Sequence, residues 1–93
     1  SLSIIHVHGE SMEPTLRDGD EVLVDASDQG SRLRDGIYVL RADDALVVKR
    51  VTIQPGGRQI TISSDNSAYP TWTDVDRSTI HVVGRVIWFG RTV

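Results

Sequence analysis

Short segments rich in β-branched residues, separated by turn-forming residues, recur along this chain of 93 residues. Turn signals stand at Asp18-Gly19, Asp35-Gly36 and Pro55-Gly56-Gly57, where the chain must reverse. No window shows a sustained helical period. The predicted strands are residues 3–8, 21–25, 37–41, 46–54, 59–63 and 80–89. Six strands in so short a chain predict a mostly β fold, built as compact, strongly bent antiparallel sheets or a small barrel.

The chain length suits a single domain over residues 1–93. Residues 25–34 are polar and are expected to form a loop, and residues 13–16 are expected to form one short helical turn. Because the sequence begins at Ser1 without an initiator methionine, we expect this domain to be the C-terminal part of a longer chain.

Composition narrows the possible classes of function. The formal net charge is −3 and the basic residues are scattered, which argues against direct nucleic-acid binding because phosphate contact needs clustered Lys and Arg. The absence of cysteine excludes disulfides, thiolate catalysis and cysteine-based zinc sites. The longest apolar runs have four residues, whereas a membrane-spanning helix needs about 20. We therefore expect a cytoplasmic domain that does not enter a membrane.

A hydroxyl lies just after a predicted strand in Gly9-Glu10-Ser11-Met12-Glu13-Pro14-Thr15-Leu16. Pro14 favours a helical turn there because its ring fixes φ. Such a turn would expose Ser11 Oγ at the end of a strand and would aim nearby backbone N–H groups at an oxygen beside it. By itself, the pattern favours a serine that only caps the turn.

Lys49 lies inside an apolar strand, Ala45-Leu46-Val47-Val48-Lys49-Arg50-Val51. Burial there would disfavour the ammonium and lower its pKa from about 10.4 toward neutrality. A neutral amine could take a proton from Ser11 and return it to a leaving amine. By itself, the simpler interpretation is a lysine that reaches past its neighbours to solvent.

Taken together and in this order, the serine and lysine segments resemble those of the LexA-like family, the C-terminal domains of LexA, UmuD and lambda-type phage repressors. The first segment, followed by Asp18-Gly19-Asp20, is similar to the family's serine box, and Val48-Lys49-Arg50-Val51 is similar to its lysine box. Glu10 stands where related repressors often carry Asp. The likeness continues through Val22-Leu23-Val24-Asp25, Ser64-Asp65-Asn66, Tyr69-Pro70 and Val83-Gly84-Arg85-Val86-Ile87-Trp88, and so covers nearly the whole chain.

The resemblance implies a serine endopeptidase with Ser11 as nucleophile, Lys49 as general base, and no metal or cofactor. The implied oxyanion hole consists of the backbone N–H groups of Ser11 and Glu10. Family members cleave their own chain at an Ala-Gly or Cys-Gly bond upstream of the serine, in many cases promoted by a RecA filament on single-stranded DNA. The cut separates an N-terminal helix-turn-helix domain from this dimerising domain. The implied partners are therefore a second copy of the chain, the RecA filament and, through the N-terminal domain, DNA.

One departure from the family concerns the bond that is cut. No Ala-Gly pair occurs in these 93 residues, and no cysteine is present to form Cys-Gly. Either the scissile bond lies upstream of residue 1, or the domain is a non-cleaving oligomerisation module of a repressor. A further alternative is the soluble domain of a type I signal peptidase, which shares a Ser-Met-x-Pro-Thr box and a Lys-Arg-Val box.

The remaining polar candidates favour ordinary structural roles. His6-x-His8 could place two imidazoles on one strand face, but the sequence offers no clear third metal ligand, so ordinary strand histidines are favoured. Asp65 and Asn66 are expected to shape a turn. A solvated turn is expected for the acidic residues Asp18, Asp20 and Glu21. The aromatic residues are expected to anchor the core or an interface, or in one case to line a substrate cleft: Trp72, Trp88 and Phe89.

Overall fold

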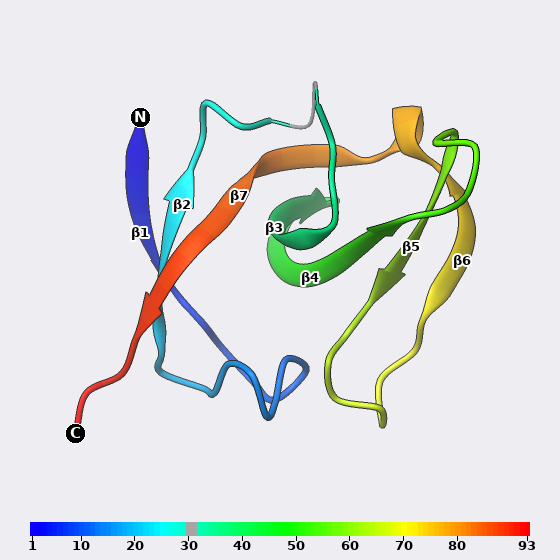
Figure 1. Ribbon diagram of the computed structural model, residues 1–93. Helices are drawn as coiled ribbons and strands as arrows, with labels where there is room; N and C mark the ends of the chain where they lie inside the picture. Colours follow the sequence, from blue (N-terminus) through cyan, green and yellow to red (C-terminus); the bar gives the residue numbers. More distant parts are fainter. Residues whose placement is uncertain (30–31) are drawn as a thin grey trace.

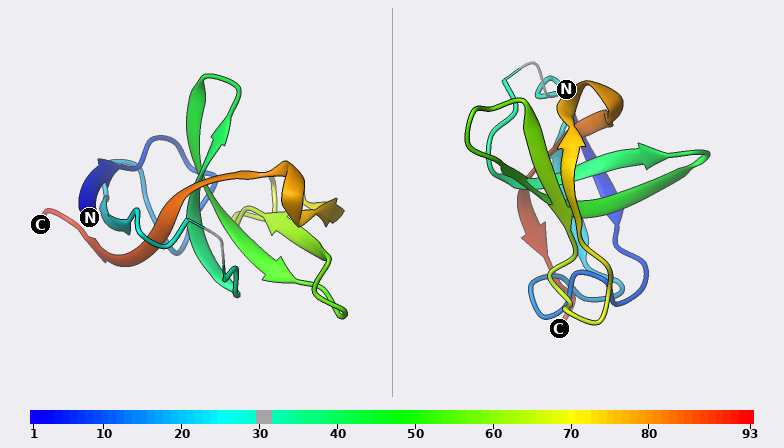
Figure 2. Two further views of the ribbon diagram at one scale, coloured as in Figure 1. Left: turned by 90° about the horizontal axis from the view of Figure 1, so that it is seen from above. Right: turned by 90° about the vertical axis from the view of Figure 1, so that its right-hand side faces the viewer.

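The computed structural model describes residues 1–29 and 32–93, and these residues form one antiparallel sheet of seven strands (Figure 1). The strands lie in the order β1-β2-β7-β3-β4-β5-β6. Their bounds are β1 (Leu2–His6), β2 (Glu21–Asp25), β3 (Gly36–Ala42), β4 (Ala45–Ile53), β5 (Gln59–Ser63), β6 (Trp72–Asp76) and β7 (His81–Gly90), with one 3-10 turn, η1 (Arg77–Thr79), before β7. Figure 2 shows that the sheet is strongly bent, with the β3–β4 hairpin projecting from the rest of the molecule. The predicted mostly β, antiparallel fold is therefore confirmed.

The six predicted strands are all present, and their ends lie within two residues of the predicted positions. The strand that the sequence analysis missed is β6. It is an edge strand that pairs only with β5, and within it only Val75 is partly buried. Because the other residues of β6 are exposed, the segment lacks the alternation of apolar and polar residues by which strands are recognised.

The predicted loop and helical turn are found close to where they were expected. Asp25 ends β2, and residues 26–29 and 32–35 lie outside the strands; Gly30 and Ser31 are outside the described residues. Residues 11–15 form turns, and the Leu16 N–H donates a hydrogen bond of 2.9 Å to the Met12 carbonyl, as in one turn of an α-helix. None of the helical structure in the described ranges has the length and apolar character needed to cross a membrane.

The last strand, β7, lies between β2 and β3 and joins the two halves of the sheet. It pairs with β2 through residues 85–90 and with β3 through residues 81–85, with a register shift in each pairing. This arrangement brings the β1–β2 hairpin, and the long loop between its strands, close to the β3–β4 hairpin. The loop that carries Ser11 thereby reaches the strand that carries Lys49.

The core consists of two clusters, one on each side of β3. Because successive side chains of a strand point to opposite faces, Val39 enters the first cluster while Tyr38 and Leu40 enter the second. Met12 and Leu16, from the turn after β1, belong to the first cluster and are almost fully buried. They fasten the serine-bearing turn to the core.

Two expectations about individual residues are wrong. Trp72, Trp88 and Phe89 are not core residues, because they are 49%, 57% and 44% exposed. The interface interpretation remains for them, and Trp72 lines a pocket. Asp20 is not solvated, because it is 1% exposed and accepts two hydrogen bonds from Arg91, of 2.7 and 2.6 Å. The arginine that neutralises it lies 71 residues away in sequence, where local patterns give no hint of the pairing.

Candidate active site

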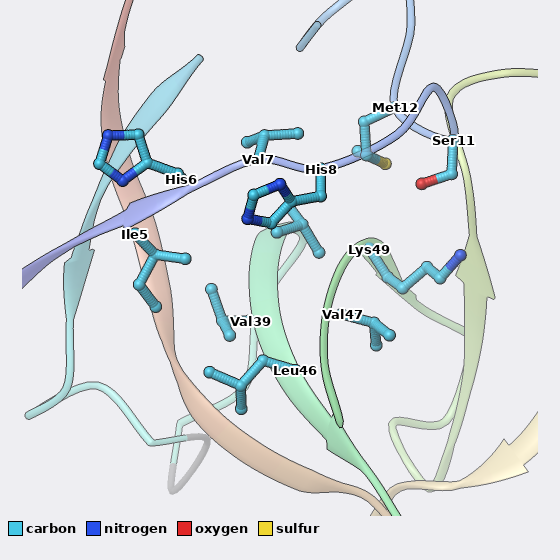
Figure 3. A pocket seen from close by; sticks show the side chains of 11 residues that line it. Ile5, His6, Val7, His8, Ser11, Met12, Val39, Leu46, Val47 and Lys49 are labelled. Atoms are coloured by element: carbon cyan, nitrogen blue, oxygen red, sulfur yellow. The ribbon is translucent and has the colours of Figure 1, made fainter. Parts of the chain in front are cut away.

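A pocket of about 410 Å³ lies between the end of β1 and the first half of β4 (Figure 3). One side is formed by the segment that leaves β1 and enters the serine-bearing turn, and the other by the β3–β4 hairpin. Both candidate catalytic residues line it. The lining residues are Ile5, His6, Val7, His8, Ser11, Met12, Val39, Leu46, Val47, Val48 and Lys49.

Ser11 is held at the pocket by the turn that follows β1. The chain changes direction at Gly9, whose φ of +83° is a left-handed conformation that glycine adopts without strain, and the Gly9 N–H donates to Asp18 Oδ1 at 2.7 Å. Met12, the next residue after Ser11, is 2% exposed and anchors the turn in the core. The turn therefore presents Ser11 at the pocket while its neighbour is fixed.

Lys49 reaches the same pocket from β4, which lies between β3 and β5. Its Nζ donates a hydrogen bond of 2.7 Å to Ser64 Oγ and lies 5.8 Å from the centre of the Trp72 ring. Partial burial lowers the pKa of the Lys49 amine below its ordinary value, because a charged ammonium loses hydration there. The neutral form, which can act as a base, is therefore more accessible than for an ordinary lysine.

Figure 3 shows the Ser11 hydroxyl and the Lys49 amine at the same end of the pocket. The structure brings together the two residues that the sequence analysis selected, although they come from distant parts of the chain. The hydrogen bond of the amine, however, is made to Ser64, which the sequence analysis did not select as a site residue. Ser64 is only 8% exposed, so its hydroxyl is a buried partner that holds the amine in place.

The residue after Ser64 connects the lysine strand to the serine-bearing turn. Asp65 accepts hydrogen bonds from Arg50 Nε at 2.7 Å and Arg50 Nη2 at 2.8 Å, and Asp65 Oδ2 also accepts one of 2.5 Å from the Thr15 hydroxyl. The Arg50 guanidinium and the Thr15 hydroxyl hold the pKa of Asp65 below its ordinary value. Arg50 follows Lys49 in β4, and Thr15 belongs to the turn after Ser11.

Asn66 completes the connection at the backbone of the serine-bearing turn. Its N–H donates to the Ser11 carbonyl at 2.9 Å, and its Nδ2 donates to the Glu10 carbonyl at 3.0 Å. The predicted turn at this segment is confirmed, since Asn66 Oδ1 accepts from the Ala68 N–H at 3.0 Å. The sequence analysis missed the long-range contacts of Ser64, Asp65 and Asn66, because these depend on how β5 pairs with β4.

His6 and His8 both line this pocket. His6 Nε2 lies 3.3 Å from Glu21 Oε2, on the neighbouring strand β2. Across residues 1–29 and 32–93, no group of three or more His, Asp or Glu side chains is arranged to hold a metal ion.

A second pocket, of about 400 Å³, shares Val47 and Lys49 with the first. Its other walls come mainly from β3, the segment at the start of β7, and the exposed Trp72. Lys49 therefore stands between a pocket that contains the Ser11 hydroxyl and a pocket that is largely apolar. A hydroxyl, an amine of lowered pKa and an adjoining apolar pocket are the components of a nucleophilic site that holds an apolar ligand.

Comparison with known proteins adds a family assignment to this geometry. The sequence pattern of the family described as Peptidase S24-like matches residues 1–87. The match covers Ser11, Lys49 and the segment from Ser64 to Asn66.

Known relatives include phage repressors. The 26 kDa repressor protein of Escherichia phage HK022 is 35% identical over 89 residues, which cover 94% of this chain and 37% of that protein. Repressor protein CI of Enterobacteria phage phi80 is 34% identical over 82 residues, covering 87% of this chain and 33% of that protein. An uncharacterized HTH-type transcriptional regulator of Haemophilus influenzae is 30% identical over 96 residues, covering 100% of this chain and 39% of that protein. The chain thus spans between about a third and two fifths of the length of these relatives.

Proposed function

Because the chain belongs to the Peptidase S24-like family, we propose that it is the peptidase domain of a self-cleaving transcriptional repressor, with Ser11 as nucleophile and Lys49 as general base. The observation that carries this proposal is a serine hydroxyl and a partly buried lysine amine at the same end of one pocket. The lowered pKa of Lys49 supports it, because only a neutral amine can accept the serine proton.

In the proposed reaction, the Lys49 amine removes the hydroxyl proton of Ser11 while Oγ attacks the carbonyl carbon of the scissile peptide. Backbone N–H groups of Ser11 and Glu10 donate hydrogen bonds to the oxyanion that forms. Protonated Lys49 then gives its proton to the leaving nitrogen, the C–N bond breaks, and an ester remains on Ser11. Lys49 next deprotonates a water, whose oxygen displaces Ser11 Oγ, and the proton returns to Ser11.

Ser64 supports this chemistry by fixing the amine. In the neutral form, Lys49 can donate one N–H to Ser64 Oγ, as in the observed bond of 2.7 Å, and still keep a lone pair for the Ser11 proton. A free lysine side chain would have to give up rotamer freedom at each turnover. The bond thus holds the base ready before substrate arrives.

The proposed substrate is a bond of the same polypeptide, upstream of residue 1. No Ala-Gly pair lies within the sequence, and the relatives with printed functions are repressors. We propose that the longer protein is cytoplasmic, binds DNA through an N-terminal domain, and is cut at an Ala-Gly or Cys-Gly bond when a RecA filament on single-stranded DNA engages it. Repressor relatives favour this function over that of a signal peptidase.

The experiment that tests the peptidase function uses the full-length protein and two single variants, Ser11→Ala and Lys49→Ala. We expect the wild type to cleave itself at alkaline pH and both variants to stay intact, while circular dichroism shows all three folded. Edman sequencing of the new N-terminus identifies the bond. Self-cleavage of folded Lys49→Ala at the wild-type rate would contradict the proposal.

We also propose that the domain forms a homodimer through an apolar surface made by Leu2, Ile4 and Trp88 on β1 and β7. Ile4 and Trp88 are 62% and 57% exposed, and both pair with Leu23 of β2, so their side chains lie on the same face of the sheet. Leu2 shares this face because it lies two residues before Ile4 in β1. Exposed apolar side chains that adjoin on one face of a sheet can mark a protein–protein contact. This proposal stands if the protein proves to be a repressor module that does not cleave.

Sedimentation equilibrium tests the dimer. We expect the wild type to be dimeric at high micromolar concentration and Ile4→Glu and Trp88→Glu to be monomeric. Trp72→Glu is the matched control, because Trp72 is also about half exposed, at 49%, but lies on β6, at the opposite edge of the sheet from β1. A wild type that is monomeric at this concentration contradicts the proposal.

A further inference from the structure

We propose that Asn66 is a positioning residue that orients the oxyanion-binding peptide of the Ser11 site. This inference rests on the proposed peptidase function and assigns a part of the site to a residue outside the serine–lysine pair. It starts from two contacts that Asn66 makes across 55 or more residues of sequence, so neither contact belongs to the local turn around Asn66.

The two contacts hold the peptide groups on either side of Ser11. Asn66 Nδ2 donates to the Glu10 carbonyl at 3.0 Å, and the Asn66 backbone N–H donates to the Ser11 carbonyl at 2.9 Å. The first carbonyl belongs to the peptide that precedes Ser11 and the second to the peptide that follows it. One residue thus restrains the backbone of the nucleophile on both sides.

The orientation of the Asn66 amide is itself fixed by a third bond. Asn66 Oδ1 accepts a hydrogen bond of 3.0 Å from the Ala68 N–H. Because Oδ1 is occupied in this way, Nδ2 is the end of the amide that faces Glu10. The side chain is therefore a donor at the Glu10 carbonyl and an acceptor within its own turn.

Because the peptide group is planar, the contact at the Glu10 carbonyl also fixes the direction of the Ser11 N–H. In a trans peptide, the C=O and the N–H point in opposite directions within one plane. Fixing the Glu10 oxygen therefore fixes the Ser11 N–H, which points away from Asn66. The Glu13 N–H donates to the same oxygen at 3.1 Å. Two donors at one carbonyl polarise the peptide and make the Ser11 N–H a stronger donor.

The Ser11 N–H has no backbone acceptor among residues 1–29 and 32–93. It is therefore free to donate to the oxygen of a bound substrate. A donor that is oriented before the reaction stabilises the oxyanion without having to reorganise, which is the main source of rate acceleration at such sites. Asn66 supplies that orientation.

Self-cleavage of the full-length protein, measured from neutral to alkaline pH, tests the inference with Asn66→Ser and Asn66→Asp. Both side chains can still accept from the Ala68 N–H and so keep the local turn. Ionised Asp has no proton to donate to the Glu10 carbonyl, and the Ser hydroxyl stands one bond short of the position of Asn66 Nδ2. Ser67→Ala is the matched control, since it changes the next residue of the same turn and leaves Asn66 in place. The Ser11→Ala and Lys49→Ala proteins serve as inactive references.

We expect both Asn66 variants to lower the limiting rate at high pH by about tenfold or more, which is less than the loss expected for removing an oxyanion donor outright. In Asn66→Ser the pH midpoint of the rate should stay at its wild-type position, because Lys49 and Ser64 are untouched and no charge is added. In Asn66→Asp the new carboxylate favours the ammonium form of Lys49, so only the limiting rate of that variant is compared. Ser67→Ala should cleave at the wild-type rate. A residue that only supported the fold would disturb Ser64 as well, and the midpoint would then shift.

A limiting rate within about twofold of wild type in a folded Asn66 variant would overturn the inference while leaving the peptidase function intact. A shifted midpoint in Asn66→Ser, or loss of the fold in both variants, would also overturn it by assigning Asn66 a structural role. If the wild type does not cleave, or if Lys49→Ala does, the proposed function fails and this inference fails with it.

Discussion

Lys49 Nζ and Ser64 Oγ lie 2.7 Å apart across two neighbouring strands, one step beyond the Arg50–Ser63 pair of β4 and β5. The contact is therefore set by the register of the sheet, and it fixes a long, flexible side chain at its amine. Because Ser64 is almost fully buried, water cannot easily replace its hydroxyl as the partner of the amine. The position of the proposed base thus depends on correct pairing of β4 with β5.

Replacing Ser64 with Ala should slow self-cleavage by about tenfold to a hundredfold, because the Lys49 amine loses the partner that orients it. A hydrogen bond to the charged form of an amine raises its pKa, so its loss should also move the midpoint of the pH–rate profile to lower pH. The measurement is the rate of self-cleavage of the full-length protein as a function of pH. Ser63→Ala is the control, and a Ser64→Ala profile that coincides with wild type would contradict this role.

The rate of self-cleavage should rise with pH. Lys49 acts as a base only when neutral, and its pKa lies below the ordinary value of 10.5 because burial disfavours the ammonium. The neutral fraction therefore increases as pH rises, and the rate should level off above a midpoint lower than 10.5. A profile that is flat between about pH 6 and pH 10 would exclude Lys49 as the titrating base.

Much of this site could be predicted from the sequence, because its two central residues stand in distinctive local surroundings. Ser11 follows a strand and precedes a proline turn, and Lys49 interrupts an apolar strand. Strands with clear alternation were found for the same reason. The missed strand, β6, has an exposed surface and pairs only at one edge, so it leaves no periodic signal in the sequence.

Contacts between distant segments could not be predicted in this way. Asp65 and Asn66 have the composition of an ordinary turn, and they do form one, but their bonds to Arg50 and to the Glu10 carbonyl follow from strand register. Asp20 likewise has the sequence surroundings of a solvated turn, yet Arg91 from the end of the chain neutralises it. Burial of a charge can be predicted only when its partner is known.

Replacing Gly84 with Ala should destabilise the domain by about 1–3 kcal/mol, the usual cost of overpacking. A Cβ added at Gly84 would lie 2.6 Å from Val24 Cγ1 and 2.7 Å from the Asp25 carbonyl oxygen, so β2 and β7 would have to move apart. Urea unfolding measures the change. In the control, Gly36→Ala, the atoms nearest the added Cβ belong to the Arg85 guanidinium, which can move at the cost of its hydrogen bond to the Tyr38 hydroxyl, so the loss should be smaller. Equal losses in the two variants would contradict this explanation.

The Asp20–Arg91 pair should make the stability of the domain sensitive to acid. The hydrogen bonds from Arg91 lower the pKa of Asp20 from 3.8 to about 2 in the folded protein. Because this folded pKa is the lower one, the stabilisation is fully present above 3.8 and is lost as the pH falls through about 2. At neutral pH, Asp20→Asn should therefore unfold at a lower urea concentration than wild type.

The comparison between the two proteins isolates Asp20 from the other carboxylates, which titrate in both. The difference between their urea midpoints should be constant from about pH 7 to pH 5 and should shrink between about pH 4 and pH 2, as Asp20 in the wild type takes up its proton. In an Arg91→Met background, adding Asp20→Asn should change the urea midpoint less than it does in the wild type, because Arg91→Met removes the partner that lowers the pKa of Asp20. A difference that stays constant down to about pH 2 would show that ionised Asp20 does not stabilise the fold.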